Sequence, residues 1–240
     1  MCTVTYIPVQ GGFLVSSNRD ETPLRAHTPL IVEKWERDEI IYPKDKKGGS
    51  WIFASTKPRV VCVLNGAFGP HIRKTPYKMS RGLVAKEVYN HPDPNTFIHS
   101  FDFTGIEPFT LLIIEEKLLF DFRWDGTATK IRNLHSNKAH IWSSATLYSS
   151  EIQKKRLRLF QNLLKSNELS PDFVRNMHRT GSVGDPRNDF IMNRDEVVKT
   201  VSITHVHYRA AQVTMEFENL ITSEVSIETR VVKNLPENLC

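Results

Sequence analysis

The chain lacks any long apolar run. No stretch of its 240 residues reaches the roughly 18 consecutive apolar residues that a membrane-spanning helix needs. Its first residues also lack the basic segment followed by an apolar segment that marks a secretory signal peptide. We therefore expect a cytoplasmic protein without a transmembrane segment.

Cysteine is scarce, with only Cys2, Cys62 and Cys240. Three widely separated cysteines form neither a disulfide framework nor a spaced metal site, so we expect reduced thiols. Among the nine histidines, His205 and His207 would share one face of a strand, but no third ligand lies near them in sequence. We expect no metal and no cofactor.

Concentrated positive charge is also missing, although the formal net charge is +5. Only residues 44–47 and 154–156 are dense in lysine and arginine, and the second group lies on a predicted helix with an apolar opposite face. That pattern is typical of a solvated helix face. Without an aromatic RNA-binding pattern or a helix-turn-helix signature, we expect no nucleic-acid partner. The sequence leaves the oligomeric state open.

Strand and helix patterns occur in blocks along the chain. Alternating or continuous apolar runs predict strands, and capped segments with helical spacing predict helices. In chain order these are strands at 2–7, 13–17, 50–55 and 60–64, helices at 81–90 and 95–101, strands at 109–114, 118–123, 128–134 and 140–143, helices from 150 and 171, and strands at 197–208, 212–219 and 221–232. This order favours an α+β fold with two antiparallel sheets between helix layers. No repeat or linker divides the chain, so we expect a single domain over residues 1–240.

The amino end carries a candidate nucleophile, Cys2. If Met1 is removed, Cys2 carries both a thiol and a free α-amine, whose pKa of about 8 suits a general base. The alternative is that Cys2 is a small apolar residue at the start of an edge strand.

Six short motifs are spread over most of the chain. They are Met1-Cys2, Asn18-Arg19-Asp20-Glu21, Gly49-Ser50-Trp51, Asn65, Ser80-Arg81-Gly82 and Thr200-Val201-Ser202. Together they resemble the NRDE family, whose eukaryotic members are called transport and Golgi organisation protein 2. That family is similar to the N-terminal nucleophile (Ntn) hydrolases of the choloylglycine hydrolase and penicillin V acylase type. The resemblance implies a four-layer αββα sandwich.

The resemblance also implies roles for individual residues. Cys2 matches the hydrolase nucleophile, Asp20 the carboxylate that orients its amine, and Asn65 the donor to the oxyanion. Ser17 stands where the hydrolases have an arginine. Arg19 could supply that guanidinium if the strand continues, because residues 17 and 19 would then share a face.

Further residues are candidates for binding. Ser144 offers a hydroxyl near the place of a second hydrolase asparagine. Trp51 either lines the pocket or fills the core. Ser17, Asn18, Trp51 and Ser144 are therefore the candidate binding residues, beside Cys2, Arg19, Asp20 and Asn65 as candidate catalytic ones.

The family resemblance implies handling of a hydrophobic metabolite. Eukaryotic relatives are associated with Golgi organisation and secretion, and members have been linked to haem trafficking and lipid metabolism. We therefore expect a small hydrophobic or amphiphilic ligand, haem or an acyl lipid, in a largely apolar pocket. The alternative is an amidohydrolase that cleaves a linear or cyclic amide C–N bond through Cys2. Loss of one oxyanion donor typically costs about 3 kcal/mol, so the altered positions would weaken such an enzyme.

Overall fold

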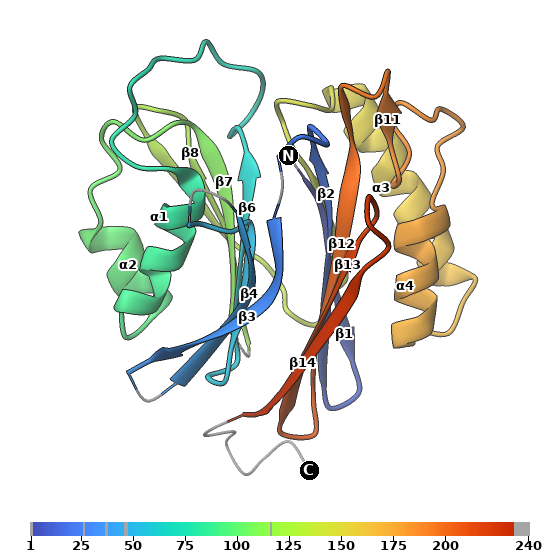
Figure 1. Cartoon of the computed structure of the whole chain (residues 1–240), viewed down its shortest axis with the longest axis horizontal. Helices are drawn as coiled ribbons and strands as arrows, with labels where there is room; N and C mark the ends of the chain where they lie inside the picture. The colour runs from blue at the N-terminus through green and yellow to red at the C-terminus, as the bar shows by residue number, and fades with distance from the viewer. Residues whose placement is uncertain (1, 26, 37, 46–47, 116, 233–240) are drawn as a thin grey trace.

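The structure is a computed structural model that describes residues 2–25, 27–36, 38–45, 48–115 and 117–232. Strands and helices follow one another in the predicted blocks (Figure 1). The strands are β1 (Cys2–Val9), β2 (Gly12–Glu21), β3 (His27–Trp35), β4 (Asp38–Asp45), β5 (Ile52–Ser55), β6 (Arg59–Asn65), β7 (Phe109–Glu115), β8 (Leu118–Trp124), β9 (Thr129–Asn133), β10 (His140–Ser143), β11 (Asn193–Arg194), β12 (Val198–Arg209), β13 (Gln212–Asn219) and β14 (Val225–Val231). The helices are α1 (Arg81–Glu87), α2 (Pro94–Ser100), α3 (Ser150–Lys165) and α4 (Pro171–Thr180), with a 3₁₀ turn at Val88–Asn90.

Two antiparallel sheets pack face to face in the middle of the molecule, with α1 and α2 outside one sheet and α3 and α4 outside the other (Figure 1). The first sheet has the strand order β10-β1-β2-β12-β13-β14, and β11 pairs with β12. The second sheet runs from β3 to β9 in sequence order. The predicted sandwich of two antiparallel sheets between helix layers is confirmed.

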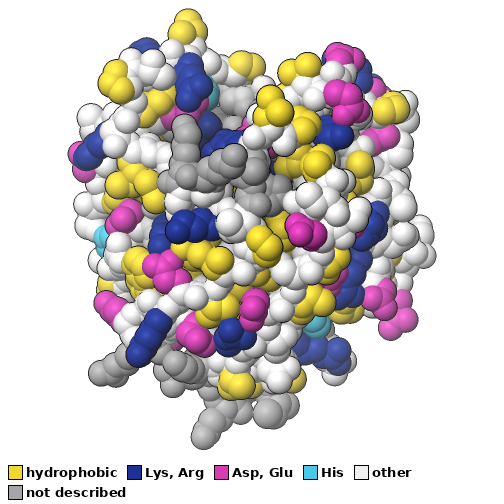
Figure 2. Space-filling model, viewed as in Figure 1, with side chains coloured by type: hydrophobic (Ala, Val, Ile, Leu, Met, Phe, Trp, Pro, Cys, Tyr) yellow, Lys and Arg dark blue, Asp and Glu magenta, His cyan; other side chains and the backbone are white. Residues whose placement is uncertain are grey.

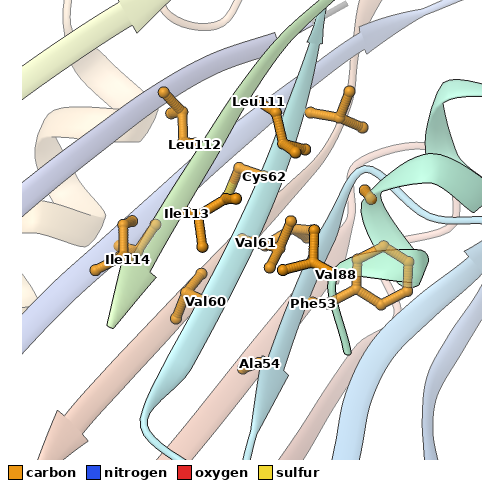
Figure 3. Packing of buried hydrophobic residues seen from close by; sticks show 14 of the residues in the cluster. Phe53, Ala54, Val60, Val61, Cys62, Val88, Leu111, Leu112, Ile113 and Ile114 are labelled. Atoms are coloured by element: carbon orange, nitrogen blue, oxygen red, sulfur yellow. The ribbon is translucent and has the colours of Figure 1, made fainter. Parts of the chain in front are cut away.

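The core explains why some strands are continuously apolar rather than alternating. Val60, Val61 and Cys62 of β6 are fully buried, because one face of the strand meets the other sheet and the opposite face meets α1. Figure 3 shows these side chains beside those of β7 and Phe53 of β5. Each fully buried large apolar side chain contributes roughly 1.5–3 kcal/mol to folding. A smaller cluster lies between the first sheet and the layer of α3 and α4.

Serine caps begin three of the helices. The side chains of Ser80, Ser149 and Ser170 accept hydrogen bonds from the backbone N–H groups at the start of α1, α3 and α4. Such a cap contributes about 1 kcal/mol. Because α1 begins at this cap, its first turn is fixed beside the end of β6.

The sequence did not predict β3 and β4. β3 is an edge strand with Pro29 and several partly exposed residues, and β4 contains Pro43, so neither shows the apolar alternation of a buried strand. Conversely, the run predicted over 221–232 is a strand only over Val225–Val231, following a turn.

Cys2 and Cys62 are both free and buried, whereas Cys240 lies outside the described residues. None of the helices in the described ranges has the length and apolar character needed to cross a bilayer. Figure 2 shows charged side chains of both signs mixed with hydrophobic ones over one face of the molecule.

Candidate functional site

The register of the N-terminal hairpin decides which candidate residues share a face. β1 pairs with β2 so that Cys2 lies opposite Arg19. Cross-strand partners share a face, as do residues two apart on a strand. Since β2 continues to Glu21, the side chains of Cys2, Ser17, Arg19 and Glu21 belong to one side of the sheet. The intervening residues Asn18 and Asp20 belong to the other.

A bulge in the neighbouring strand accompanies this segment. β12 pairs Thr200 with Asp20 but Ser202 with Arg19, so Val201 is the extra residue. The Thr200-Val201-Ser202 motif therefore forms an irregularity beside Arg19 and Asp20. Bulges often occur where a sheet must redirect a side chain near a site.

A cleft of about 290 Å³ opens where β2 and β6 end. Four cationic side chains line it: Arg19, Arg25, Arg73 and Arg81. Three carboxylates line it as well: Glu21, Asp45 and Glu107. Trp51, Val63 and Met79 add apolar surface, and Asn65 and Tyr77 add polar groups. The cleft is therefore more charged than the largely apolar pocket that we expected.

Two of the short motifs meet at one wall of this cleft. A Cβ at Gly82 would lie 2.7 Å from the backbone oxygen of Ser50, and a Cβ at Gly49 would lie 3.1 Å from the Gly82 carbonyl carbon. Only glycine allows the two backbones to approach this closely. This contact brings Trp51 and Arg81, which are thirty residues apart, to the same cleft.

Arg19 and Trp51 form a stacked pair in the cleft. The guanidinium carbon lies 4.2 Å from the centroid of the Trp51 ring, and the two residues are only 3% and 6% exposed. Burial lowers the pKa of Arg19 from its ordinary value, but an arginine still keeps its charge at neutral pH. A desolvated cation over an aromatic face is stabilised by about 2 kcal/mol. The cleft thus holds a positive charge shielded from bulk water.

Charged side chains in the walls of the cleft form ion pairs. Arg25 lies 2.8 Å from Glu21 and 2.6 Å from Asp45. Arg81 lies 3.2 Å from Glu107. These pairs fix the walls of the cleft, and the Glu21 carboxylate also accepts a hydrogen bond from the Thr22 N–H.

Cys2 lies beneath this cleft rather than among its lining residues. It is 1% exposed and belongs to the apolar cluster between the sheets. Burial raises the pKa of the Cys2 thiol, and the charge of Arg19 and the nearby Ser17 hydroxyl counteract part of that increase. Ser17 Oγ makes no hydrogen bond of ordinary geometry with any described group. In this environment the neutral thiol is favoured.

Asp20 faces the helix layer. Its carboxylate accepts hydrogen bonds of 2.8 Å from Tyr148 Oη and from Thr200 Oγ1. Burial raises the pKa of Asp20, and the positive charge of Arg156 lowers it in part. Arg156 itself is fully buried over the Tyr148 ring, so it does not share the solvated face that we expected for the 154–156 group as a whole.

Asn18 also serves the helix layer. Its Nδ2 donates to the carbonyl oxygens of His178 and Phe190, at 2.9 and 2.7 Å. Its Oδ1 lies 2.6 Å from His178 Nδ1. Every polar atom of this side chain is therefore engaged away from the cleft.

Asn65 and Ser144 link the two sheets. Asn65 ends β6 and lines the cleft, and its backbone oxygen accepts a 2.9 Å hydrogen bond from Ser144 Oγ. The backbone N–H of Ser144 donates to the Cys2 carbonyl oxygen at 3.0 Å. Ser144 thus joins the strand of Cys2 to the strand of Asn65 without lining the cleft.

Among the predicted residues, the structure brings Arg19, Trp51 and Asn65 into one cleft, with Cys2 and Ser17 on the same face of the sheet as Arg19. It places Asn18 and Asp20 on the opposite side of the sheet. Sequence reasoning assigned no role to Arg81 or Glu107. Arg81 belonged to a recognised motif, which was a usable signal, whereas Glu107 lies in a loop without any local pattern.

The histidines do not form a metal site in the part of the chain that is described, where no group of three or more potential ligands occurs. His205 Nδ1 lies 2.8 Å from Ser16 Oγ, beneath α4.

Solved structures with this arrangement are known. Conjugated bile acid hydrolase from Clostridium perfringens, in two variant structures, matches with a TM-score of 0.55 and 8% identity, covering 98% of this chain and 97% of that chain. Penicillin V acylase from Agrobacterium tumefaciens matches with a TM-score of 0.58 and 10% identity, covering 95% and 85%. These likenesses confirm the predicted Ntn-hydrolase-like fold. At such low identity they concern the fold alone.

Among curated protein sequences, none matches this chain. The family model described as Transport and Golgi organisation 2 matches residues 1–220, which include all six motifs. The chain therefore belongs to the Transport and Golgi organisation 2 family.

Proposed function

We propose that this protein binds a small amphiphilic metabolite, of the haem or acyl-lipid class, and that the cleft receives the anionic group of that ligand. The observation that carries the proposal is the buried Arg19 guanidinium stacked on Trp51. A buried cation of this kind attracts a carboxylate or phosphate strongly, because little water screens it. We further propose that this binding underlies a role in metabolite trafficking, and through it in Golgi organisation and secretion.

The cleft has features that suit both parts of such a ligand. Arg19 and Arg81 offer planar donor groups for an anion, while Trp51, Val63 and Met79 offer apolar contact. The volume of about 290 Å³ lies near the lower end of small-molecule sites. It fits the polar end of a ligand whose apolar part extends outward.

Titration with haemin and with oleate tests this proposal, with tryptophan fluorescence as the signal. Arg19→Met removes the charge but retains an apolar stem. We expect saturable binding by the unmodified protein and an affinity at least about tenfold weaker in the variant, as for a lost charge-assisted hydrogen bond. Arg187→Met is the matched control, because Arg187 is exposed and pairs with Asp195 outside the cleft. Absence of saturable binding of both probes, or equal binding by Arg19→Met, would contradict the proposal.

A second candidate function is an N-terminal cysteine amidohydrolase. The observation that favours it is the position of Cys2, opposite Arg19 and joined through Ser144 to Asn65 at the cleft. If Met1 is removed, the α-amine of Cys2 takes the thiol proton and the thiolate attacks an amide carbonyl. The C–N bond breaks as the amine leaves with that proton, and water hydrolyses the thioester.

Intact mass spectrometry tests the prerequisite of this second function. Retention of Met1 in the purified protein would exclude the α-amine mechanism. If Met1 is absent, we expect stoichiometric labelling of Cys2 by iodoacetamide well below pH 8, abolished in Cys2→Ser. Cys62→Ser is the matched control, because Cys62 is equally buried but lies within β6.

A further inference from the structure

β14 ends the first sheet and leaves one edge open. It pairs with β13 over seven residue pairs, from Gln212–Val231 to Glu218–Val225. No other described strand pairs with it. Figure 1 shows β14 next to β13, as the last strand of the first sheet. An edge strand carries a row of backbone groups that can accept another strand.

Two hydrogen bonds that flank the pairing of β13 with β14 show which residues face that edge. Val232 N donates to Ala211 O, and Asn219 N donates to Glu224 O, at the two ends of the ladder. The even-numbered residues of β14 therefore direct their backbone groups toward β13. The odd-numbered residues direct theirs toward the open edge. In agreement, the Thr229 carbonyl accepts a 2.8 Å hydrogen bond from the Arg230 side chain rather than from β13.

The strand lacks two of the usual protections of an edge. It contains no proline and no lysine, and natural edges commonly use these residues to prevent pairing. The side chains of Val225, Ile227 and Val231 are 55%, 58% and 66% exposed. The outward-facing positions are thus apolar or threonine.

The charges of β14 are complementary to a second copy of the same strand in a register centred on Thr229. We propose that β14 pairs antiparallel with β14 of a second copy of this chain, about a two-fold axis at Thr229, so that the first sheet continues across a dimer. Glu228 then lies opposite Arg230 of the second copy, twice by symmetry. Ile227 lies opposite Val231 of the second copy.

Neighbouring registers are disfavoured by the same charges. Moving the axis to residue 228 places Glu228 opposite itself, and moving it to residue 230 places Arg230 opposite itself. Like charges directly opposite each other destabilise an antiparallel pair. In the Thr229 register, odd-numbered residues meet with their outward N–H and C=O groups aligned, and the side chains of Glu228 and Arg230 occupy the closer pairs. Pairing there replaces the hydrogen bond between the Arg230 side chain and the Thr229 carbonyl oxygen.

Such a contact is smaller than a standard interface, which buries about 1,600 Å². We therefore expect a reversible dimer whose population rises with protein concentration. Arg230 also lies 2.8 Å from Glu228 of its own strand and 3.5 Å from Glu39. Its side chain is already held next to the proposed interface.

Site-directed cross-linking tests the register. In a Cys240→Ser background, Thr229→Cys places the two new thiols on adjacent strands with Cα atoms about 5.5 Å apart, within disulfide range. We expect efficient dimer formation on mild oxidation or with a short bismaleimide. Ile227→Cys is the matched control, because its two copies would be about 13 Å apart along the strands. Equal cross-linking of both variants, or none for Thr229→Cys, would overturn the proposal.

A charge exchange tests the proposed pairs without new cysteines. Sedimentation equilibrium should show a dimer dissociation constant about tenfold weaker for Glu228→Arg and for Arg230→Glu, since each places two like-charge pairs across the axis. The double variant should recover the original constant. Unfolding curves of the three variants separate this effect from loss of fold. A monomer at every concentration, or a dimer unchanged by the single reversals, would contradict the interface.

Discussion

The two sides of β2 near its end differ in what their polar groups do. On one side, Arg19 and Glu21 line the cleft. On the other side, Asn18 and Asp20 bind groups of the helix layer and its connecting loops. The comparison shows that four consecutive residues, Asn18-Arg19-Asp20-Glu21, contain two separate sets, one that forms the site and one that attaches the sheet to its helices. The alternation of a strand makes this separation possible.

The largest expected effect is on the helix-facing side. Asn18→Ala removes three buried hydrogen bonds, with the carbonyl oxygens of His178 and Phe190 and with His178 Nδ1. Of these three groups, the Phe190 carbonyl oxygen keeps a 3.3 Å hydrogen bond from Thr200 Oγ1. Each lost partner costs roughly 1 kcal/mol, so we expect about 3 kcal/mol lower unfolding free energy. Urea denaturation measures this. A loss below about 1 kcal/mol would show that Asn18 does not attach the helix layer.

Acidic pH should lower the unfolding free energy through histidines on this helix-facing side. Burial lowers the pKa of His205 to about 3, with help from Arg175 and Arg179, and burial lowers the pKa of His178 as well. Above pH 6.5 these histidines are neutral in both the folded protein and the unfolded chain. As the pH falls from 6.5 toward 3, the unfolded chain binds protons that the folded protein does not, so stability decreases.

At pH 5 the contribution of His205 amounts to about 2 kcal/mol. Asp20, whose pKa burial raises, acts in the opposite direction, and therefore a variant is needed to isolate the histidine. Denaturation curves at pH 7 and pH 5 should show a smaller acid loss for His205→Asn than for the unmodified protein. An identical acid-induced loss of stability in the two proteins would contradict this role of His205.

Substitutions on the cleft-facing side should change ligand affinity more than the unfolding free energy. Arg19→Lys keeps the charge but loses the planar stack on Trp51. We expect ligand affinity about fivefold weaker, less than for Arg19→Met, as for a lost contact of about 1 kcal/mol. The haemin and oleate titrations measure it. Full affinity in Arg19→Lys would show that charge alone matters and not the stack.

The smallest expected effect is at Glu21. In Glu21→Gln, Arg25 keeps its 2.6 Å contact with Asp45, and Arg25 is partly exposed. We therefore expect unfolding free energy to change by less than about 0.5 kcal/mol. Anionic ligands should bind slightly more tightly, since one negative charge leaves the cleft. Weaker binding on titration would instead assign Glu21 a direct contact with the ligand.

Sequence patterns predicted much of the fold because they are local. The alternation in β1 and β2, the apolar run of β6 and the serine caps of α1 and α4 each reflect the residues immediately around them. The strands β3 and β4 were missed because each contains a proline, and β3 is also an edge strand, so neither shows that pattern. The candidate residues Cys2, Arg19 and Asn65 were found through motifs, and their catalytic roles remain predictions.

The sequence by itself determined which residues of β2 share a side, because the spacing of side chains along a strand is fixed. It did not determine what each side meets. Tyr148 reaches Asp20, and Arg81 and Glu107 reach the cleft, from segments far away in the chain. Only the packing of two sheets and their helix layers brings these segments together, because that packing depends on the summed burial of many distant side chains rather than on any local pattern.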